Sequence, residues 1–289
     1  MKLVLLVGPP GSGKSTLAKK YIAEGFAYVN QDSQGKLDHI EIFRQAQRDG
    51  KNILVDRMNF NKQQRVNYLY NANTYGYETE IIVLHQPYQV CLERIRARFG
   101  QHETIHDEKA ARGALKTFFG QYERPYEGEA DKITFLYPEG EKPSAIVCDL
   151  DGTLCNIEHR RHHVRRTDGQ KKDWGAFYRD IPKDTINRWC AEIIHTLKGS
   201  HSIVLCSGRD TNQQKATVDW LQKHEVYYDA LYMRDRTDSR QDYIVKEIIL
   251  DFEILTRYTP YFMIDDRKQV VDMWRKRGFT CLQCDEGDF

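Results

Sequence analysis

Two aspartates end an apolar run in the stretch Ile146-Val147-Cys148-Asp149-Leu150-Asp151-Gly152-Thr153. The apolar run predicts a buried strand, and the Gly-Thr pair predicts that the chain leaves the strand there. Because the chain bends at this point, both carboxylates can approach one phosphate. One can attack phosphorus and form an aspartyl phosphate, while the other protonates the leaving oxygen and later activates water. We assign the nucleophile to Asp149 and the acid/base role to Asp151, with Mg²⁺ to screen the repulsion between carboxylate and phosphate.

Other strand patterns in the second half end in residues that would complete this site. Ser207 follows the apolar residues 203–206 and can donate to the phosphate, and Arg209 can bind substrate charge. Lys246 begins a predicted helix and can neutralise the phosphate and the aspartyl intermediate. Asp265 and Asp266 end the strand pattern that starts at residue 261 and suit Mg²⁺. The metal ligands expected in this half are therefore Asp149, Asp151, Asp265 and Asp266.

A phosphate-binding motif opens the first half, where Gly8-Pro9-Pro10-Gly11-Ser12-Gly13-Lys14-Ser15 fits G-x-x-x-x-G-K-[ST]. A predicted strand precedes this motif and a predicted helix follows it, which is the context that the motif requires. Its backbone N–H groups can wrap nucleotide phosphates, Lys14 can reach the β and γ oxygens, and Ser15 can ligate Mg²⁺. The nucleotide-binding residues expected here are Gly8, Gly11, Ser12, Gly13, Lys14, Ser15 and Thr16.

Strand and helix patterns alternate along both halves, which predicts parallel sheets with crossover helices. In the first half we expect strands at 26–29, 52–55, 80–84 and 131–136, and helices at 36–48, 61–73 and 107–123. In the second half we expect a helix at 184–197. The two prolines and the glycine of residues 138–143 break regular structure. The sequence therefore predicts an α/β protein of two doubly wound parallel-sheet domains, 1–138 and 144–289.

Acidic residues follow two of the expected strands in the first half. Asp32 follows the strand at 26–29, where a carboxylate could orient an acceptor hydroxyl and take its proton, although a solvated turn aspartate is the alternative. Asp56 follows the strand at 52–55 and could be a structural cap, a contact behind a metal ligand or a catalytic group. Asn59, Asn61 and Arg65 continue that loop and are candidates to line an acceptor groove.

Arginines on the predicted helix around residues 91–98 are the last candidates of the first half. Arg94 and Arg98 share one helix face, whereas Arg96 points elsewhere. The pair could close over ATP and neutralise charge on the transferred group, with a solvated basic helix as the alternative. Arg98 is therefore expected in catalysis, and both Arg94 and Arg98 in nucleotide binding.

Composition limits the remaining classes of function. Lys+Arg 43 against Asp+Glu 42 gives a net charge of +1, so nucleic-acid contacts must come from local clusters. One such cluster is basic and aromatic, at residues 159–166 and 171–178, and suits a phosphodiester backbone with stacked bases.

The seven scattered cysteines suit reduced thiols, and the single pair Cys281 and Cys284 lacks partners for a zinc site. No apolar run approaches the ~18 to 20 residues of a membrane span, so we expect a soluble, cytoplasmic protein without membrane contact.

These motifs together resemble the bifunctional polynucleotide 5′-kinase/3′-phosphatases of the T-even phage type. The resemblance covers nearly the whole chain and is strongest at residues 264–275 and at Gly287-Asp288-Phe289. It implies a P-loop kinase in which Asp32 is the general base for a 5′-hydroxyl, followed by a phosphatase of the haloacid-dehalogenase superfamily. It also implies substrate-pocket roles for Arg160, Arg234, Asp238 and Asp242. The chain departs from the phage pattern at Gly35-Lys36, where the phage proteins carry an arginine.

The function implied is the healing of RNA or DNA ends. ATP would phosphorylate 5′-hydroxyl ends, and 3′-phosphates would be removed through an aspartyl phosphate with Mg²⁺. The resemblance implies partnership with a polynucleotide ligase, self-association, and an origin compatible with a phage gene in a bacterial host. Two alternatives remain at this point: a small-molecule kinase fused to a phosphatase of the same metabolite, and a nucleotide-binding adaptor with relic sites.

Overall fold

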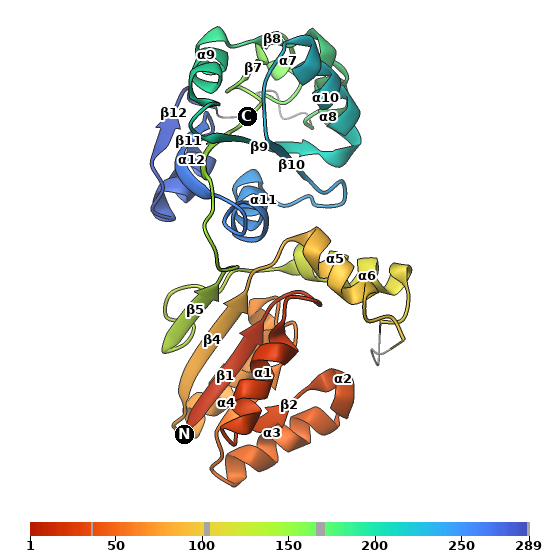
Figure 1. Ribbon diagram of the computed structural model, residues 1–289, viewed down its shortest axis with the longest axis vertical. Coiled ribbons are helices and arrows are strands. Elements are labelled where there is room, and N and C mark those ends of the chain that lie inside the picture. Colours follow the sequence, from red (N-terminus) through yellow and green to blue (C-terminus); the bar gives the residue numbers. More distant parts are fainter. Residues whose placement is uncertain (36, 101–104, 166–170, 288–289) are drawn as a thin grey trace. The chain divides into compact units, whose positions relative to one another are not determined.

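The computed structural model describes all residues except 36, 101–104, 166–170 and 288–289. The chain divides into two compact units, residues 1–139 and 140–289. Each unit contains its own five-stranded sheet in which every pair of neighbouring strands is parallel (Figure 1). The predicted fold class, two parallel-sheet α/β domains, is confirmed.

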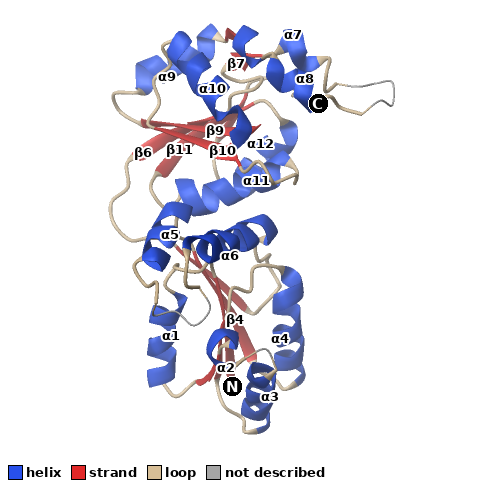
Figure 2. Ribbon diagram, turned by 90° about the vertical axis from the view of Figure 1, so that its right-hand side faces the viewer, coloured by secondary structure: helices blue, strands red, loops and turns tan. Residues whose placement is uncertain are grey.

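The sheet of the first unit has the strand order β2-β3-β1-β4-β5. Its elements are β1 (Lys2–Val7), α1 (Lys14–Ala23), β2 (Ala27–Val29), α2 (Gln31–Gln34), α3 (Asp38–Arg48), β3 (Ile53–Asp56), α4 (Lys62–Thr74), β4 (Glu78–Leu84), α5 (Tyr88–Arg96), α6 (Glu108–Gln121) and β5 (Lys132–Leu136). Helices α1 and α4 lie on opposite faces of this sheet (Figure 2). The all-apolar run of β1 follows from this arrangement, because its side chains are covered on both faces.

The sheet of the second unit has the strand order β10-β9-β6-β11-β12, and a two-stranded antiparallel pair, β7-β8, accompanies it. Its elements are β6 (Ser144–Cys148), β7 (Cys155–Asn156), α7 (Glu158–Arg161), α8 (Trp174–Arg179), η1 (Ile181–Lys183), β8 (Thr185–Ile186), α9 (Arg188–Leu197), β9 (Ser202–Asp210), η2 (Thr211–Gln213), α10 (Gln214–Lys223), β10 (Ala230–Arg234), α11 (Asp242–Ile249), η3 (Leu250–Ile254), β11 (Thr259–Asp265), α12 (Lys268–Lys276) and β12 (Cys281–Gln283).

Alternate residues of the central strand β6 enter two different cores. Ile146 and Cys148 pack with buried residues of α9 and α10, whereas Ala145 and Val147 pack with those of α11 and α12. Both faces of the sheet are therefore covered, and the polar residues that end β6 and its neighbours gather at one edge. This edge carries the second candidate site.

Some element boundaries differ from the sequence-based expectation. The helix expected at 184–197 begins at Arg188, because residues 185–186 form β8 and pair with β7. The short helix α2, which contains Asp32, stands where a loop was expected. Lys246 lies in the second turn of α11, which begins at Asp242. Among the described residues, no helix has both the length and the apolarity to cross a bilayer.

Candidate active sites

The first candidate site surrounds the glycine-rich loop between β1 and α1. A cavity of about 1170 Å³ opens there, and Gly11, Gly13, Lys14, Ser15 and Thr16 line it. Gly11 and Gly13 have φ angles of 82° and 101°, in the left-handed region that favours glycine. A side chain at Gly11 would also place its Cβ 2.6 Å from the carbonyl oxygen of Cys91. The loop therefore requires these glycines in order to form.

Lys14 lies inside this loop, where its ammonium donates to the carbonyls of Gly8 at 2.8 Å and Pro9 at 3.0 Å. Burial lowers its pKa, although the carboxylate of Asp56 opposes this shift. Gly8 and Ser12 belong to the loop but do not line the cavity. At Gly8 a Cβ would lie 2.7 Å from the Ser12 hydroxyl and 3.0 Å from the carbonyl oxygen of Leu84, so Gly8 allows the loop to pack against β4.

Asp56 stands directly behind the phosphate loop. Its carboxylate accepts hydrogen bonds from the hydroxyls of Ser15 and Tyr28, each at 3.0 Å. The side chain of Asn30 donates to the Asp56 carbonyl at 3.0 Å and to the Tyr28 hydroxyl at 2.9 Å. Of the three alternatives left open for Asp56, this geometry favours a contact that orients Ser15. The Tyr28 and Asn30 contacts were not anticipated, because no motif marks either residue.

Three of the predicted kinase residues meet at the same cavity. Asp32 lines it from α2, Arg94 lines it from α5, and Arg98 lines it from the turn after α5. Arg94 donates to the Gly11 carbonyl at 3.3 Å, and Nε of Arg98 donates to the Arg94 carbonyl at 3.1 Å. Arg96 instead pairs with Glu108 at 2.5 Å, as the helical spacing indicated. Two carboxylates, of Asp32 and Asp56, and three guanidinium groups, of Arg57, Arg94 and Arg98, thus line the cavity beside Lys14.

The residues expected in an acceptor groove after Asp56 do not line the phosphate-loop cavity. The Asn59 side chain is fully buried and donates to the Leu6 carbonyl at 2.9 Å, which fixes the loop. Asn61 caps α4 by accepting from the Gln64 amide. Arg65 is fully buried and pairs with both carboxylate oxygens of Glu129 at 2.6 and 3.1 Å. Lys36 lies outside the described residues.

The second candidate site lies at the carboxyl ends of β6 and β11. Oxygens of Asp149, Asp265 and Asp266 come within 4.8 Å of one another. Lys246 reaches this group from α11, with Nζ 2.7 Å from Asp149 and 2.9 Å from Asp265. Burial would lower the pKa of Lys246, but the surrounding carboxylates outweigh it and raise that pKa well above its usual range. A permanent positive charge therefore stands beside the predicted nucleophile.

The surroundings of the Asp266 carboxylate show whether this group of three aspartates fits a metal ion. Both of its oxygens are buried and have no hydrogen-bond partner in the described chain. Burial, followed by the neighbouring Asp265 carboxylate, raises the pKa of Asp266 to about 7. Unsatisfied buried carboxylates at this spacing are the ligands that Mg²⁺ takes in proteins. Asp149, Asp265 and Asp266 therefore fit a divalent cation.

Asp151 pairs with two arginines and does not join the group formed by Asp149, Asp265 and Asp266. Its carboxylate accepts from Arg160 at 2.5 Å and from Arg209 at 2.5 to 3.1 Å, and it lies outside the metal-binding group. Burial would raise the pKa of Asp151, but the two arginines outweigh it and hold that pKa far below its usual range. In the described chain Asp151 is therefore an ionised carboxylate. Its expected roles as metal ligand and as acid and base stay predictions.

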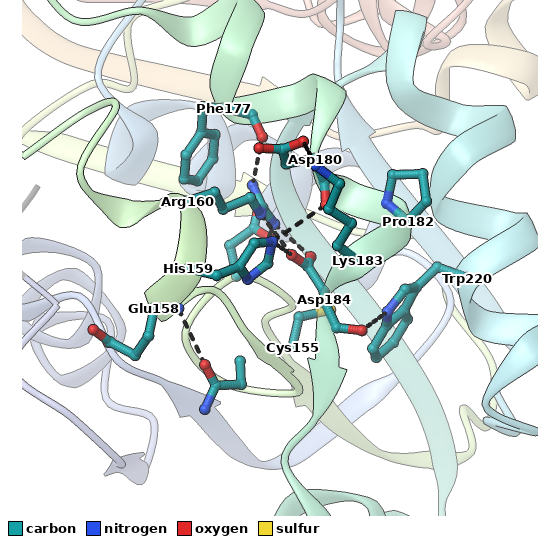
Figure 3. A network of polar contacts seen from close by, with 12 residues as sticks. Cys155, Glu158, His159, Arg160, Phe177, Asp180, Pro182, Lys183, Asp184 and Trp220 are labelled. Atoms are coloured by element: carbon teal, nitrogen blue, oxygen red, sulfur yellow. Dashed lines mark hydrogen bonds and ion pairs between the residues drawn. The ribbon is translucent and has the colours of Figure 1, made fainter.

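Arg160 and Arg209 also hold a second carboxylate, that of Asp184. Arg160 donates to both oxygens of Asp184 at 2.6 Å, and Arg209 donates to one of them at 3.1 Å. Figure 3 shows Asp184 beside Arg160, with the Phe177 ring against that guanidinium at 4.0 Å. Both arginines are fully buried and position Asp151, and the substrate contacts expected of them stay a prediction. Asp184 was missed because it follows a polar loop without any motif.

Three further predicted residues hold Lys246 and its surroundings in place. Asp242 accepts from Arg234 at 3.1 Å and lies 3.6 Å from the Lys246 ammonium. Asp238 pairs with Arg240 at 2.5 Å, and its carbonyl accepts from Arg234. Arg234 therefore contacts both Asp238 and Asp242, and the substrate contacts expected of these three residues stay a prediction. Ser207 is buried, and its hydroxyl oxygen accepts the Arg209 backbone N–H at 3.2 Å.

The basic and aromatic segment after this site forms α7 and α8. Arg161 pairs with Glu158 and with Asp285, whereas the Trp174 ring is 40% exposed. Arg166 lies outside the described residues, as do Asp288 and Phe289 of the resembling terminal segment. All seven cysteines lie in the described chain and are free thiols.

Comparison with known proteins gives matches to both halves. Residues 143–289 match the family model described as polynucleotide kinase PNKP phosphatase domain, and residues 37–125 match the model of an AAA domain. A putative bifunctional polynucleotide kinase/RNA ligase of Autographa californica nuclear polyhedrosis virus is 25% identical over 312 residues, which cover 95% of this chain and 41% of the relative. The chain therefore spans less than half of that curated relative.

A second viral protein and a solved structure also match the chain. A putative bifunctional polynucleotide phosphatase/kinase of Acanthamoeba polyphaga mimivirus is 31% identical over 86 residues, or 28% of this chain and 20% of the relative. Among solved structures, a chain of the Pnkp1/Rnl/Hen1 RNA repair complex is 27% identical with a TM-score of 0.44, and the match covers 100% of this chain and 97% of the other.

Proposed function

Because the chain belongs, through residues 143–289, to the polynucleotide kinase PNKP phosphatase domain family, we propose that it heals nucleic-acid ends. It transfers the γ-phosphoryl group of ATP to a 5′-hydroxyl and hydrolyses a phosphate from a 3′ end. The observation that supports this proposal most is the family match together with a phosphate-binding loop whose cavity is also lined by Asp32, Arg94 and Arg98. The baculoviral relative, whose match covers 95% of the chain, is described as a putative bifunctional polynucleotide kinase/RNA ligase, which supports the proposed kinase activity.

In the kinase unit, the acceptor 5′-oxygen forms a bond to the γ-phosphorus while the bond from that phosphorus to the bridging oxygen of ADP breaks. Asp32 takes the proton of the hydroxyl, and Lys14, Arg94 and Arg98 stabilise charge on the transferred group. Ser15, oriented by Asp56, would hold Mg²⁺, which would supply positive charge to the nucleotide phosphates. The chain's own contribution is therefore mainly positioning and positive charge.

In the phosphatase unit, Asp149 attacks the phosphorus of the 3′-phosphate as the bond from that phosphorus to the 3′-oxygen breaks, which leaves an aspartyl phosphate. Asp151, protonated in the complex with substrate, gives its proton to the departing 3′-oxygen. Water then attacks the same phosphorus, the bond to Asp149 breaks to release inorganic phosphate, and Asp151 takes back a proton from that water. Lys246 screens the charge of Asp149. Asp149, Asp265 and Asp266 would hold Mg²⁺, whose charge lowers the repulsion between carboxylate and phosphate.

The products are a 5′-phosphate and a 3′-hydroxyl, the pair of ends that a polynucleotide ligase joins. We therefore propose a functional partnership with such a ligase, and the fused ligase in the description of the baculoviral relative supports it. The relative spans more than twice the length of this chain, so the ligase activity would come from another segment or another protein.

One experiment tests the two-site proposal. An RNA and a DNA oligonucleotide, each with a 5′-hydroxyl and a 3′-phosphate, are incubated with ATP and Mg²⁺, and both ends are followed by mass spectrometry. We expect Lys14→Ala to abolish 5′-phosphorylation only, and Asp149→Asn to abolish 3′-dephosphorylation only. Loss of both activities in either variant would refute independent sites. Turnover of a nucleoside or sugar without any change in the oligonucleotides would favour the metabolic alternative.

A further inference from the structure

A second cavity, of about 560 Å³, lies beside the phosphate-loop cavity in the first unit. Its walls are the facing helices α3 and α4. The residues that these two helices contribute are His39, Ile40, Phe43 and Arg44 from α3, and Gln63, Gln64, Asn67, Tyr68 and Asn71 from α4. Gln31, Arg57 and Gln64 line both cavities, so the two spaces meet at these side chains. A ligand that has one end beside Lys14 and Asp32 can therefore continue between α3 and α4.

The charge of this second cavity favours an anion. Arg44 and Arg57 line it, and none of the described lining residues is acidic. Arg57 donates from Nη1 to the Tyr68 hydroxyl at 2.9 Å, which fixes the guanidinium at the junction of the two cavities. A guanidinium held in this way has lost part of its conformational freedom before a ligand binds, and phosphate is the anion that its planar donors suit.

The uncharged lining adds two further features. Gln63, Asn67 and Asn71 are spaced by four residues on α4, so their carboxamides form a row along one helix face. Carboxamides both donate and accept hydrogen bonds, which suits the polar edges of bases and sugar hydroxyls. The exposed Ile40 and the Tyr68 ring give the same space an apolar wall. A nucleotide has a phosphate, a sugar and base with polar groups, and a flat apolar base face. The arginines, the carboxamides and the apolar wall of this cavity suit these three parts.

We propose that the cavity between α3 and α4 binds the second nucleotide of the acceptor strand. Arg57 and Arg44 contact the phosphodiester that joins it to the 5′-terminal nucleotide, and the α4 carboxamides contact its base and sugar. This inference rests on the proposed kinase function and adds to it a requirement for a strand. An acceptor without the first phosphodiester cannot use Arg57 or Arg44, so it is bound less tightly than a dinucleotide.

Steady-state kinase assays with two acceptors test this site. One acceptor is a nucleoside, and the other is a 5′-hydroxyl dinucleotide with a 3′-hydroxyl, which gives the phosphatase unit no substrate. We expect Arg57→Ala to raise KM for the dinucleotide by about tenfold, and Arg44→Ala by several-fold, because each removes a charge-assisted contact with phosphate. KM for the nucleoside and for ATP should stay as in the wild type in Arg44→Ala, because Arg44 lines the second cavity and not the phosphate-loop cavity.

Arg48→Ala is the matched control. Arg48 lies one turn beyond Arg44 on α3 but pairs with Glu41 at 2.6 Å and does not line the cavity. This variant should leave every KM unchanged. The proposal fails if Arg57→Ala and Arg44→Ala keep the wild-type KM for the dinucleotide. It also fails if they raise KM for the nucleoside as much as for the dinucleotide. A wild-type protein that phosphorylates no oligonucleotide would instead remove the proposed kinase function, and this site with it.

Discussion

Replacing Asp184 with asparagine should destabilise the second unit and impair the phosphatase while leaving the kinase intact. Asp184 is fully enclosed, and its carboxylate oxygens accept three hydrogen bonds from Arg160 and Arg209 at 2.6, 2.6 and 3.1 Å. Two carboxylates, Asp151 and Asp184, balance the two guanidinium groups in this cluster. Asparagine removes one negative charge and turns an N–H donor toward an arginine donor, so one buried positive charge remains uncompensated.

The expected cost follows from burial. Removing one partner of a buried ion pair costs about 3 to 5 kcal/mol, because the other charge stays desolvated without its counterion. With a urea m value of roughly 2 kcal/mol/M, a loss of about 3 kcal/mol lowers the unfolding midpoint by about 1.5 M. Asp151 also loses the neighbour that shares its arginines, so we expect a lower kcat for 3′-phosphate removal.

Tryptophan fluorescence during urea unfolding measures this effect selectively. All four tryptophans, at positions 174, 189, 220 and 274, belong to the second unit, so the signal reports the phosphatase fold alone. Asp180→Asn is the matched control, because Asp180 is partly exposed and pairs with the exposed Lys183. An Asp184→Asn midpoint within about 0.3 M of the wild type would refute the buried-charge reasoning. Loss of kinase activity in the same protein would refute the independence of the two units.

Three further outcomes are expected at the two sites. Asp56→Asn should lower kinase kcat at a given Mg²⁺ concentration without affecting the phosphatase, because the Ser15 hydroxyl loses its anionic acceptor; a titration of kcat against Mg²⁺ measures this. Gly152→Ala should abolish phosphatase activity in an assay on a 3′-phosphorylated oligonucleotide, because the residue has a φ of 92° and a Cβ would lie 2.3 Å from the Asp266 carboxylate. The pKa of Asp266, raised to about 7 from a usual value of about 4, makes the folded metal-free protein bind a proton that the unfolded chain has lost. Its stability in urea, measured without Mg²⁺, should therefore fall as the pH rises from about 4 to 7, and Asp266→Asn should reduce that slope.

The parts of the two sites that sequence could predict are those fixed by local order. A glycine-rich loop between a strand and a helix determines where Lys14 and Ser15 lie, and apolar strands that end in acidic residues bring Asp149, Asp265 and Asp266 to one edge of a parallel sheet. Each of these placements needs only the hydrophobic period and the parallel arrangement of strands. The fold class follows from the same two features.

Contacts between distant segments could not be predicted in this way. Asp151 meets Arg209, which lies 58 residues along the chain, and Arg209 also meets Asp184, which the sequence placed at the start of an expected helix. Sequence indicates that a polar residue stands after a strand, but not whether another part of the chain buries it. Asn59 and Arg65 show the same limit, because each looked available for a substrate and each is fully buried in bonds to the backbone or to Glu129.

Charge balance decides which of two similar carboxylate groups in the second unit suits a metal ion. Oxygen or sulfur atoms of Asp151, Cys155 and Asp184 approach within 4.8 Å of one another, as do the oxygens of Asp149, Asp265 and Asp266. The first group already has two arginines for its two carboxylates, so a dication there would meet two guanidinium groups. The second group has three carboxylates, of which Lys246 contacts Asp149 and Asp265. The oxygens of Asp266 have no partner in the described chain, so a divalent cation would compensate the charge that Asp266 carries when it is ionised.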